Sequence, residues 1–204
     1  MAIYLVEDEI GFDTGLIGYP SLGGCMAVAL QTEHGLFGFH DPPGHTARTT
    51  KFDEFCRAHT QYGALLNLFG SCKWTDRYAG GSAFTQWVAE MRDIAGKLNF
   101  TGVVSGLDIT SAATGITNIG AAYVEYVRSI TSGAVQIKYA YMAGLDVKKE
   151  KDETSGIQKI HPDMSTQAPY LNKVTKDVTG AMGAVDDQTT GGKTATGFYS
   201  FRLS

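Results

Sequence analysis

A cysteine and a histidine are the residues of this sequence best suited to chemistry. Cys25 follows Gly23 and Gly24, and His40 lies fifteen residues further along the chain. An imidazole can take the proton of a nearby thiol and leave a reactive thiolate. Two glycines let backbone N–H groups approach a developing oxyanion. The pattern therefore predicts a nucleophile at Cys25, a general base at His40 and an oxyanion-binding turn at Gly23-Gly24.

The elements that must position these two side chains form a predicted β-hairpin over residues 25–40. An alternating apolar strand is followed by a turn signal at Glu33-His34-Gly35 and by a returning strand that ends at His40. A turn at this place puts Ala27 opposite His40, so that Cys25 lies diagonally from His40 on the same face. A register shifted by one residue would separate the two side chains onto opposite faces.

The imidazole of a Cys–His pair needs a third group that orients it. Asp41, Tyr19, Thr14 or a backbone carbonyl could accept a hydrogen bond from its second ring nitrogen, and the sequence leaves all four open. Among the other histidines, His34 lies in the turn and is expected to be solvated.

The three cysteines indicate free thiols. Their number is odd, their spacings are wide and none belongs to a CxxC pair, so we expect no disulfide framework and no zinc or other metal site. Cys72 is a rival nucleophile, because Lys73 and Arg77 could lower the pKa of its thiol. No histidine is close to Cys72 in the sequence, and this favours Cys25.

The Leu22-Gly23-Gly24-Cys25 turn, followed by an apolar strand, a turn and His40, resembles the catalytic core of the cytotoxic-necrotizing-factor type glutamine deamidases. It is similar, more loosely, to the chemotaxis receptor deamidases. The resemblance covers residues 22–44. The toxin-type pattern has Ser at the position of Gly23 and Thr-Gly after the histidine, where this chain has Asp41-Pro42.

This resemblance implies a β-sandwich flanked by helices and a defined reaction. Cys25 attacks the side-chain amide of a glutamine in a protein substrate, ammonia leaves, and water releases a glutamate from the thioester. His40 acts first as base and then as acid, and no cofactor is needed. The resemblance also implies an effector toxin that a dedicated bacterial system delivers into a target cell.

Two other function classes stay open. The aromatic residues of the Trp74–Tyr78 loop, together with long polar loops, are compatible with a non-catalytic interaction or immunity-type module. The same Cys–His pair could also serve another hydrolase, such as a protease or a transglutaminase.

The chain as a whole predicts one α+β domain over residues 1–204, with an antiparallel β-sandwich-like core and two helices packed on it. The first helix is expected to begin at Thr49 or Thr50 and to end at Gly70, and the second to begin near Ser82. We expect a strand over 107–110, long polar loops with one or two short strands over 143–196, and a final strand over 197–203.

Composition excludes several partners. The net charge is −4, and no basic stripe is present, so neither nucleic acid nor an anionic membrane is an expected partner. No apolar stretch approaches the ~20 residues of a membrane span. The acidic start, Met1–Asp13, lacks the features of a Sec signal, which predicts synthesis in the cytosol.

Overall fold

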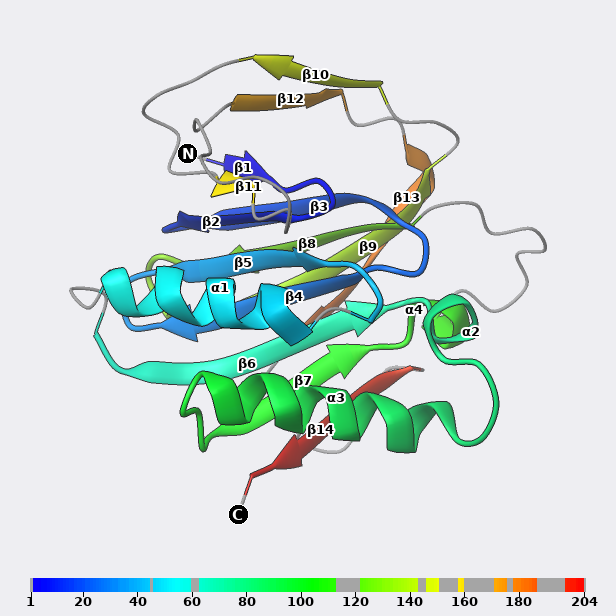
Figure 1. Cartoon of the computed structure of the whole chain (residues 1–204). Coiled ribbons are helices and arrows are strands. Elements are labelled where there is room, and N and C mark those ends of the chain that lie inside the picture. The colour runs from blue at the N-terminus through cyan, green and yellow to red at the C-terminus, as the bar shows by residue number, and fades with distance from the viewer. Residues whose placement is uncertain are drawn as a thin grey trace.

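The computed structural model describes residues 2–44, 46–59, 63–112, 122–142, 146–150, 158–159, 171–175, 178–186 and 197–203. Two β-sheets face each other, and helices cover the outer face of the larger sheet (Figure 1). This architecture confirms the expected sheet-dominated α+β fold. Most strand pairs are antiparallel, but β1 with β3 and β6 with β7 are parallel.

The larger sheet has seven strands in the order β11-β2-β5-β4-β6-β7-β14. The β4–β5 hairpin lies within it, with the predicted turn between its strands. The bounds are β2 Glu9–Asp13, β4 Met26–Thr32, β5 Leu36–Asp41, β6 Leu65–Cys72, β7 Val103–Leu107, β11 Gln158–Lys159 and β14 Phe198–Arg202.

The smaller sheet has five strands in the order β1-β3-β8-β9-β13. Its strands are β1 Ala2–Tyr4, β3 Leu16–Leu22, β8 Ala122–Arg128, β9 Val135–Met142 and β13 Val178–Asp186. A separate pair is formed by β10 Asp146–Glu150 and β12 Leu171–Thr175.

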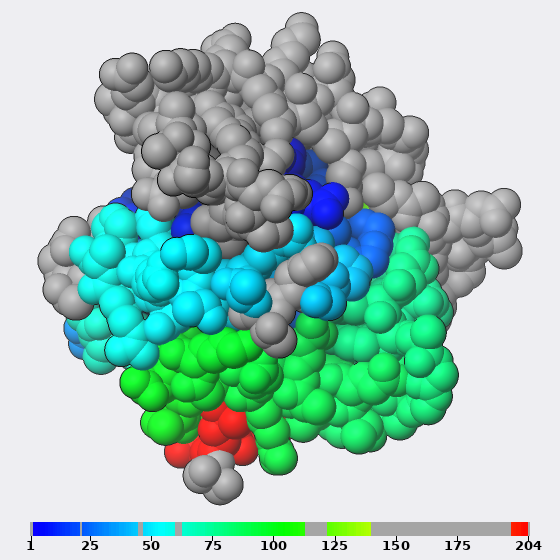
Figure 2. Space-filling view, viewed as in Figure 1, coloured from blue at the N-terminus to red at the C-terminus, as the bar shows by residue number. Residues whose placement is uncertain are grey.

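Helices α1 (Thr46–Ala58) and α3 (Ala83–Lys97) pack on one face of the larger sheet, and Figure 2 shows them side by side on that face. Ser82 caps α3 by accepting a hydrogen bond from the backbone N–H of Thr85, as a helix beginning near Ser82 requires. Two short helices, α2 (Trp74–Arg77) and α4 (Ile109–Ala112), lie at the end of the sheet. None of the helices described is long and apolar enough to cross a membrane.

Two apolar layers follow from this arrangement. Alternate residues of β4 point in opposite directions, so one set packs between the two sheets and the other packs under the helices. The layer between the sheets includes Ala27 and Ala29, whereas the layer under the helices includes Met26, Val28 and Leu30. Strand β4 is therefore buried on both faces.

The structure corrects three predictions of secondary structure. The first helix begins at Thr46 rather than at Thr49 or Thr50, and it ends at Ala58 rather than at Gly70. Residues 65–70, expected as its last turns, belong to strand β6 between β4 and β7. The apolar run of this segment is buried from Leu68 onward, and a short apolar run suits a buried strand as well as a helix face. Residues 109–110 belong to α4 rather than to a strand.

The third correction concerns the segment 143–196, expected as loops with one or two short strands. Its described residues form four strands, and β13 extends the smaller sheet along β9. The remaining residues of the segment lie outside the described part of the chain. Residues 9–22, for which the sequence pattern offers no prediction of secondary structure, form strands β2 and β3.

The close approach of β6 and β7 provides a test of this packing. A methyl group at Gly106 would overlap the backbone carbonyl of Gly70, so we expect Gly106→Ala to destabilise the fold by about 1–3 kcal/mol. The matched control is Gly96→Ala on α3, where the added methyl would meet no described atom within 4 Å apart from its chain neighbours and the backbone of its own helix, and alanine should stabilise the helix by about 0.5–1 kcal/mol. Urea unfolding of both variants measures the difference, and equal stabilities would contradict the β6–β7 contact.

Candidate active site

Cys25 and His40 lie on the same face of the larger sheet. Cys25 immediately precedes β4, and the hairpin register pairs Ala27 with His40, as predicted. Side chains two residues apart point the same way, so Cys25 is the diagonal neighbour of His40. Cys25 belongs to the apolar layer between the sheets, with an exposed fraction of 8%, and His40 is 1% exposed.

The imidazole of His40 is held by a backbone carbonyl. Its Nδ1 lies 2.8 Å from the carbonyl oxygen of Leu5, which connects β1 to the next turn. A carbonyl oxygen only accepts hydrogen bonds, so we assign the proton of the neutral ring to Nδ1. Leu5 is itself anchored, because its N–H donates to the carbonyl of Gly18 over 2.8 Å. The ring is thus fixed by the main chain of the smaller sheet.

The other ring nitrogen, Nε2, is left with a lone pair. It is buried and has no hydrogen-bond partner among the described residues. Burial lowers the pKa of His40 to about 4, although the hydrogen bond to Leu5 acts in the opposite direction. The ring is therefore neutral at neutral pH. A neutral imidazole with Nδ1 protonated and Nε2 free has the form that a general base requires.

The thiol of Cys25 is protonated in the resting protein. Burial raises its pKa to about 12, and the negative charge of Glu7 is the next largest contribution in the same direction. Arg77 acts against this rise. The resting pair is therefore a neutral thiol and a neutral imidazole rather than a preformed thiolate–imidazolium pair, and the thiolate must form by proton transfer during a reaction.

The two glycines before Cys25 differ in their surroundings. A Cβ added to Gly23 would meet no atom within 4 Å, so open space lies beside this residue. Gly24 packs closely against Pro43, 3.3 Å from the position of such a Cβ. In the described turns and loops, no carbonyl accepts the backbone N–H of Gly23, Gly24 or Cys25. These N–H groups are compatible with binding an oxyanion.

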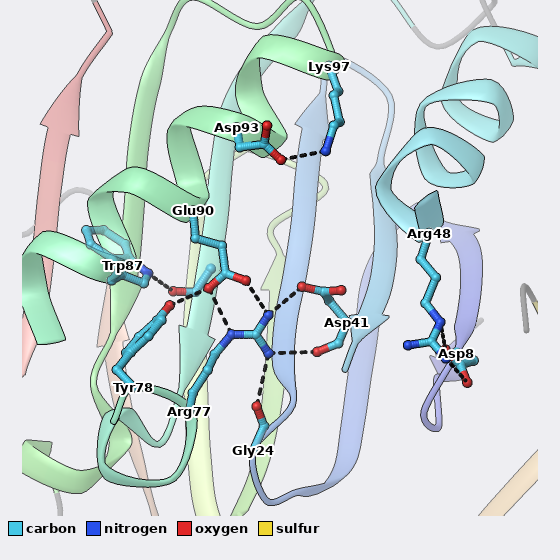
Figure 3. Close-up of polar contacts among 11 residues, drawn as sticks. Asp8, Gly24, Asp41, Arg48, Arg77, Tyr78, Trp87, Glu90, Asp93 and Lys97 are labelled. Atoms are coloured by element: carbon cyan, nitrogen blue, oxygen red, sulfur yellow. Dashed lines mark hydrogen bonds and ion pairs between the residues drawn. The ribbon is translucent and has the colours of Figure 1, made fainter. Parts of the chain in front are cut away.

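Arg77, at the end of α2, contacts the chain on both sides of the candidate pair (Figure 3). Its Nη1 donates to the carbonyl of Gly24 over 3.0 Å and to the carbonyl of Asp41 over 2.9 Å. Its Nη2 donates to the carboxylate of Asp41 over 2.6 Å, and the carboxylate of Glu90 accepts from Nε and Nη2 over 2.9 and 2.5 Å. The residue before Cys25 and the residue after His40 are therefore bound to one guanidinium.

None of the three side chains considered as the orienting group is hydrogen-bonded to His40. The Asp41 carboxylate binds Arg77 instead, since alternation along β5 directs it away from the His40 face. The Tyr19 hydroxyl donates to the carbonyl of Val28 over 2.6 Å, although its ring packs near that of His40 at a centroid distance of 6.2 Å. Thr14 is exposed. The fourth alternative, a backbone carbonyl, is the one present.

The rival thiol, Cys72, lies on the other face of the sheet. It ends β6 opposite Met26, is fully buried in the layer under the helices, and burial raises the pKa of its thiol. Cys56 of α1 is half-buried, and burial raises its pKa also. His34 lies in the β4–β5 turn, as expected. Of the three thiols, Cys25 has a histidine beside it on the same sheet face.

Sequence reasoning allowed a backbone carbonyl as the group that orients His40, but it could not identify the carbonyl of Leu5, because any residue supplies such a group. It missed the role of Arg77. Arg77 was visible only as a basic residue near Cys72, and its contacts to Gly24 and Asp41 depend on the placement of α2. Comparison of the chain with protein-family models gave no match, and comparison with curated proteins also gave none.

The lowered pKa of His40 predicts a specific dependence of stability on pH. Above the ordinary value of 6.5 the ring is neutral in both states, whereas between 6.5 and about 4 only the unfolded chain binds the proton. The free energy of unfolding therefore contains a contribution from burying His40 in its neutral form. This contribution is fully present above pH 6.5, and about 3 kcal/mol of it is lost as the pH falls toward 4. Burial also raises the pKa of Asp41 to about 7, but Asp41 titrates in both proteins. Urea unfolding from pH 7 to pH 4 should therefore show wild type losing about 3 kcal/mol more than His40→Gln, and parallel curves would contradict it.

The charge of Glu7 predicts a change in thiol reactivity. We expect Glu7→Gln to lower the pKa of Cys25 and to raise its rate of alkylation by iodoacetamide at pH 8 about twofold or more. Peptide mass spectrometry assigns the label to Cys25. Glu54→Gln, which removes an exposed carboxylate of α1, serves as the control and should leave the rate unchanged. The same rate in both variants would contradict an influence of Glu7 on the thiol.

Proposed function

We propose that this protein is a cysteine-dependent protein glutamine deamidase, with Cys25 as nucleophile and His40 as general base. The observation that carries the proposal is the state of His40. Its Nδ1 is hydrogen-bonded to the Leu5 carbonyl, its buried Nε2 has no partner within the described part of the chain, and Cys25 is its diagonal neighbour on the same sheet face. The resemblance of residues 22–44 to glutamine deamidases supports a side-chain amide as the group attacked.

The proposed first half-reaction forms a thioester. The Cys25 thiol transfers its proton to Nε2 of His40, and the thiolate sulfur bonds to the amide carbon of a glutamine side chain. The resulting oxyanion accepts hydrogen bonds from backbone N–H groups at Gly24 and Cys25. The carbon–nitrogen bond then breaks, and the imidazolium donates its proton to the departing nitrogen, which leaves as ammonia. The neutral ring is restored.

The second half-reaction releases glutamate. Nε2 of His40 takes a proton from a water molecule, whose oxygen bonds to the thioester carbon. The carbon–sulfur bond breaks, and the imidazolium returns the proton to the sulfur of Cys25. The sum of both halves is a glutamine side chain plus water giving a carboxylic acid plus ammonia, which exchange a proton to give glutamate and ammonium, so no cofactor is required. The Leu5 carbonyl stabilises the imidazolium formed in each half by accepting its Nδ1 proton in a hydrogen bond.

The two alternative functions differ in what supports them. A protease or transglutaminase could use the same pair, and the reaction products distinguish these enzymes from a deamidase. The interaction-module hypothesis is weakened, because its aromatic residues fold onto the core. Trp74 is 6% exposed and stacks on Tyr199 at a centroid distance of 4.7 Å, and the hydroxyl of Tyr78 donates to Glu90.

The test is incubation of the purified chain with a panel of folded proteins, followed by ammonia assay and peptide mass spectrometry. We expect ammonia release together with the conversion of a substrate glutamine into glutamate. Cys25→Ala should abolish the conversion, and His40→Ala should reduce its rate about 10²–10⁴-fold. Cys56→Ala is the matched control, because it removes a thiol away from the site and should leave the rate unchanged.

Other outcomes decide against the proposal. Cleavage of the substrate chain would identify a protease, and incorporation of an added primary amine would identify a transglutaminase. Conversion that persists in Cys25→Ala would exclude Cys25 as the nucleophile. A peptide with a chloroketone in place of the glutamine amide gives a check that is independent of the natural substrate, since it should label Cys25 and neither Cys56 nor Cys72.

A further inference from the structure

The side chain of Arg77 is 2% exposed, and its hydrogen bonds match its donors one for one. A guanidinium has five N–H groups. The N–H at Nε binds Glu90, the two at Nη1 bind the carbonyls of Gly24 and Asp41, and the two at Nη2 bind the carboxylates of Asp41 and Glu90. A lysine has three donors on one nitrogen and could not reproduce this planar set.

The two carbonyl contacts lie where the β4–β5 ladder ends. The last paired residues of the hairpin are Met26 and Asp41, and the pairing of β4 with β6 also ends at Met26. Gly24 and Cys25 therefore lie beyond the ladder hydrogen bonds that fix the rest of β4. Arg77 binds the carbonyls of both Gly24 and Asp41 at this point. Its guanidinium therefore holds the segment before β4 to the end of β5, where the hydrogen bonds between the strands have ended.

The charges around Arg77 indicate that its role is geometric. Two carboxylates, those of Asp41 and Glu90, bind the single guanidinium, so the cluster as a whole supplies no excess positive charge to the thiol. Burial raises the pKa of the Cys25 thiol despite the presence of Arg77. A cation placed to stabilise a resting thiolate would instead lower the pKa of the thiol below its ordinary value.

We propose that Arg77 is a positioning residue that fixes the distance between the Cys25 sulfur and Nε2 of His40 by binding the carbonyls of Gly24 and Asp41. This inference rests on the proposed pairing of Cys25 with His40. Without the guanidinium, Gly24 keeps its packing against Pro43 and against the backbone oxygen of Asp76 but loses this hydrogen bond, and Cys25 would sample positions from which proton transfer to His40 is slow.

The test is a double-mutant cycle between Arg77 and His40, read out by the alkylation rate of Cys25 with iodoacetamide at pH 7. His40→Ala should slow alkylation of the otherwise wild-type protein about tenfold, because the base is lost. In the Arg77→Lys background, His40→Ala should change the rate less than about twofold. If a substrate is in hand, Arg77→Lys should lower kcat about tenfold with little change of KM.

The matched control is Trp87→Phe. It removes a buried hydrogen bond from the indole to the carbonyl of Gly70, between α3 and β6, without touching Cys25 or His40. Its urea unfolding gives the effect of lost stability alone, and its Cys25 alkylation should depend on His40 as in wild type. Arg77→Gln provides a second variant should lysine at this buried position prevent folding, with the same expectation as Arg77→Lys.

Three outcomes separate the claims. If the alkylation rate of the wild type does not depend on His40, the proposed pairing itself fails, whatever Arg77 does. If it does depend on His40 and the folded Arg77 variants keep that dependence, the positioning role of Arg77 is wrong. Glu90→Gln removes a charge from the cluster but no carbonyl contact, so a loss of dependence as large as in Arg77→Lys would assign the effect to charge and overturn the geometric role.

Discussion

The burial of strand β4 on both of its faces is the constraint from which the rest of the arrangement follows. Every residue of β4 is buried, and over residues 26–30 the small side chains point toward the other sheet and the larger ones toward the helices. A shift of one residue would force Met26, Val28 and Leu30 into the space that Ala27 and Ala29 occupy between the sheets. The register is thus fixed by packing volume, and with it the shared face of Cys25 and His40.

The same packing explains why this face can hold a polar pair. Ala27, Ala29 and Gly38 leave room between the sheets, and the hydroxyl of Tyr19 enters there to donate to the carbonyl of Val28. Nε2 of His40 is a buried acceptor with no partner among the residues that the structure describes, and such an acceptor costs about 1–3 kcal/mol of folding free energy. Such groups are uncommon in native proteins, and a catalytic role is one of the reasons for which they persist.

The resting charges of the site and its proposed activity are consistent with each other. Burial keeps both the thiol and the imidazole neutral, so the free protein holds no exposed thiolate at neutral pH. Proton transfer to His40 becomes favourable as the sulfur bonds to an electrophilic carbon, and with a substrate amide the charge then moves to an oxyanion that N–H groups can bind. Reactivity would then depend on geometry rather than on a lowered thiol pKa, and this makes the contacts of Arg77 with Gly24 and Asp41 important.

Local pattern determined the β4–β5 hairpin and the start of α3, because alternation, a turn signal and a capping serine act between residues close in sequence. The sequence allowed the observed register, and the packing of β4 on both of its faces fixed it. Local pattern did not predict β6, because its apolar run fits a helix face equally well. Pairing with β4 and β7 makes this segment a central strand of the larger sheet. The third group on His40 and the contacts of Arg77 were decided by tertiary structure. A backbone carbonyl such as that of Leu5 carries no residue signature, and Arg77 reaches Gly24 and Asp41 only because α2 follows β6 at the edge where the hairpin ladder ends.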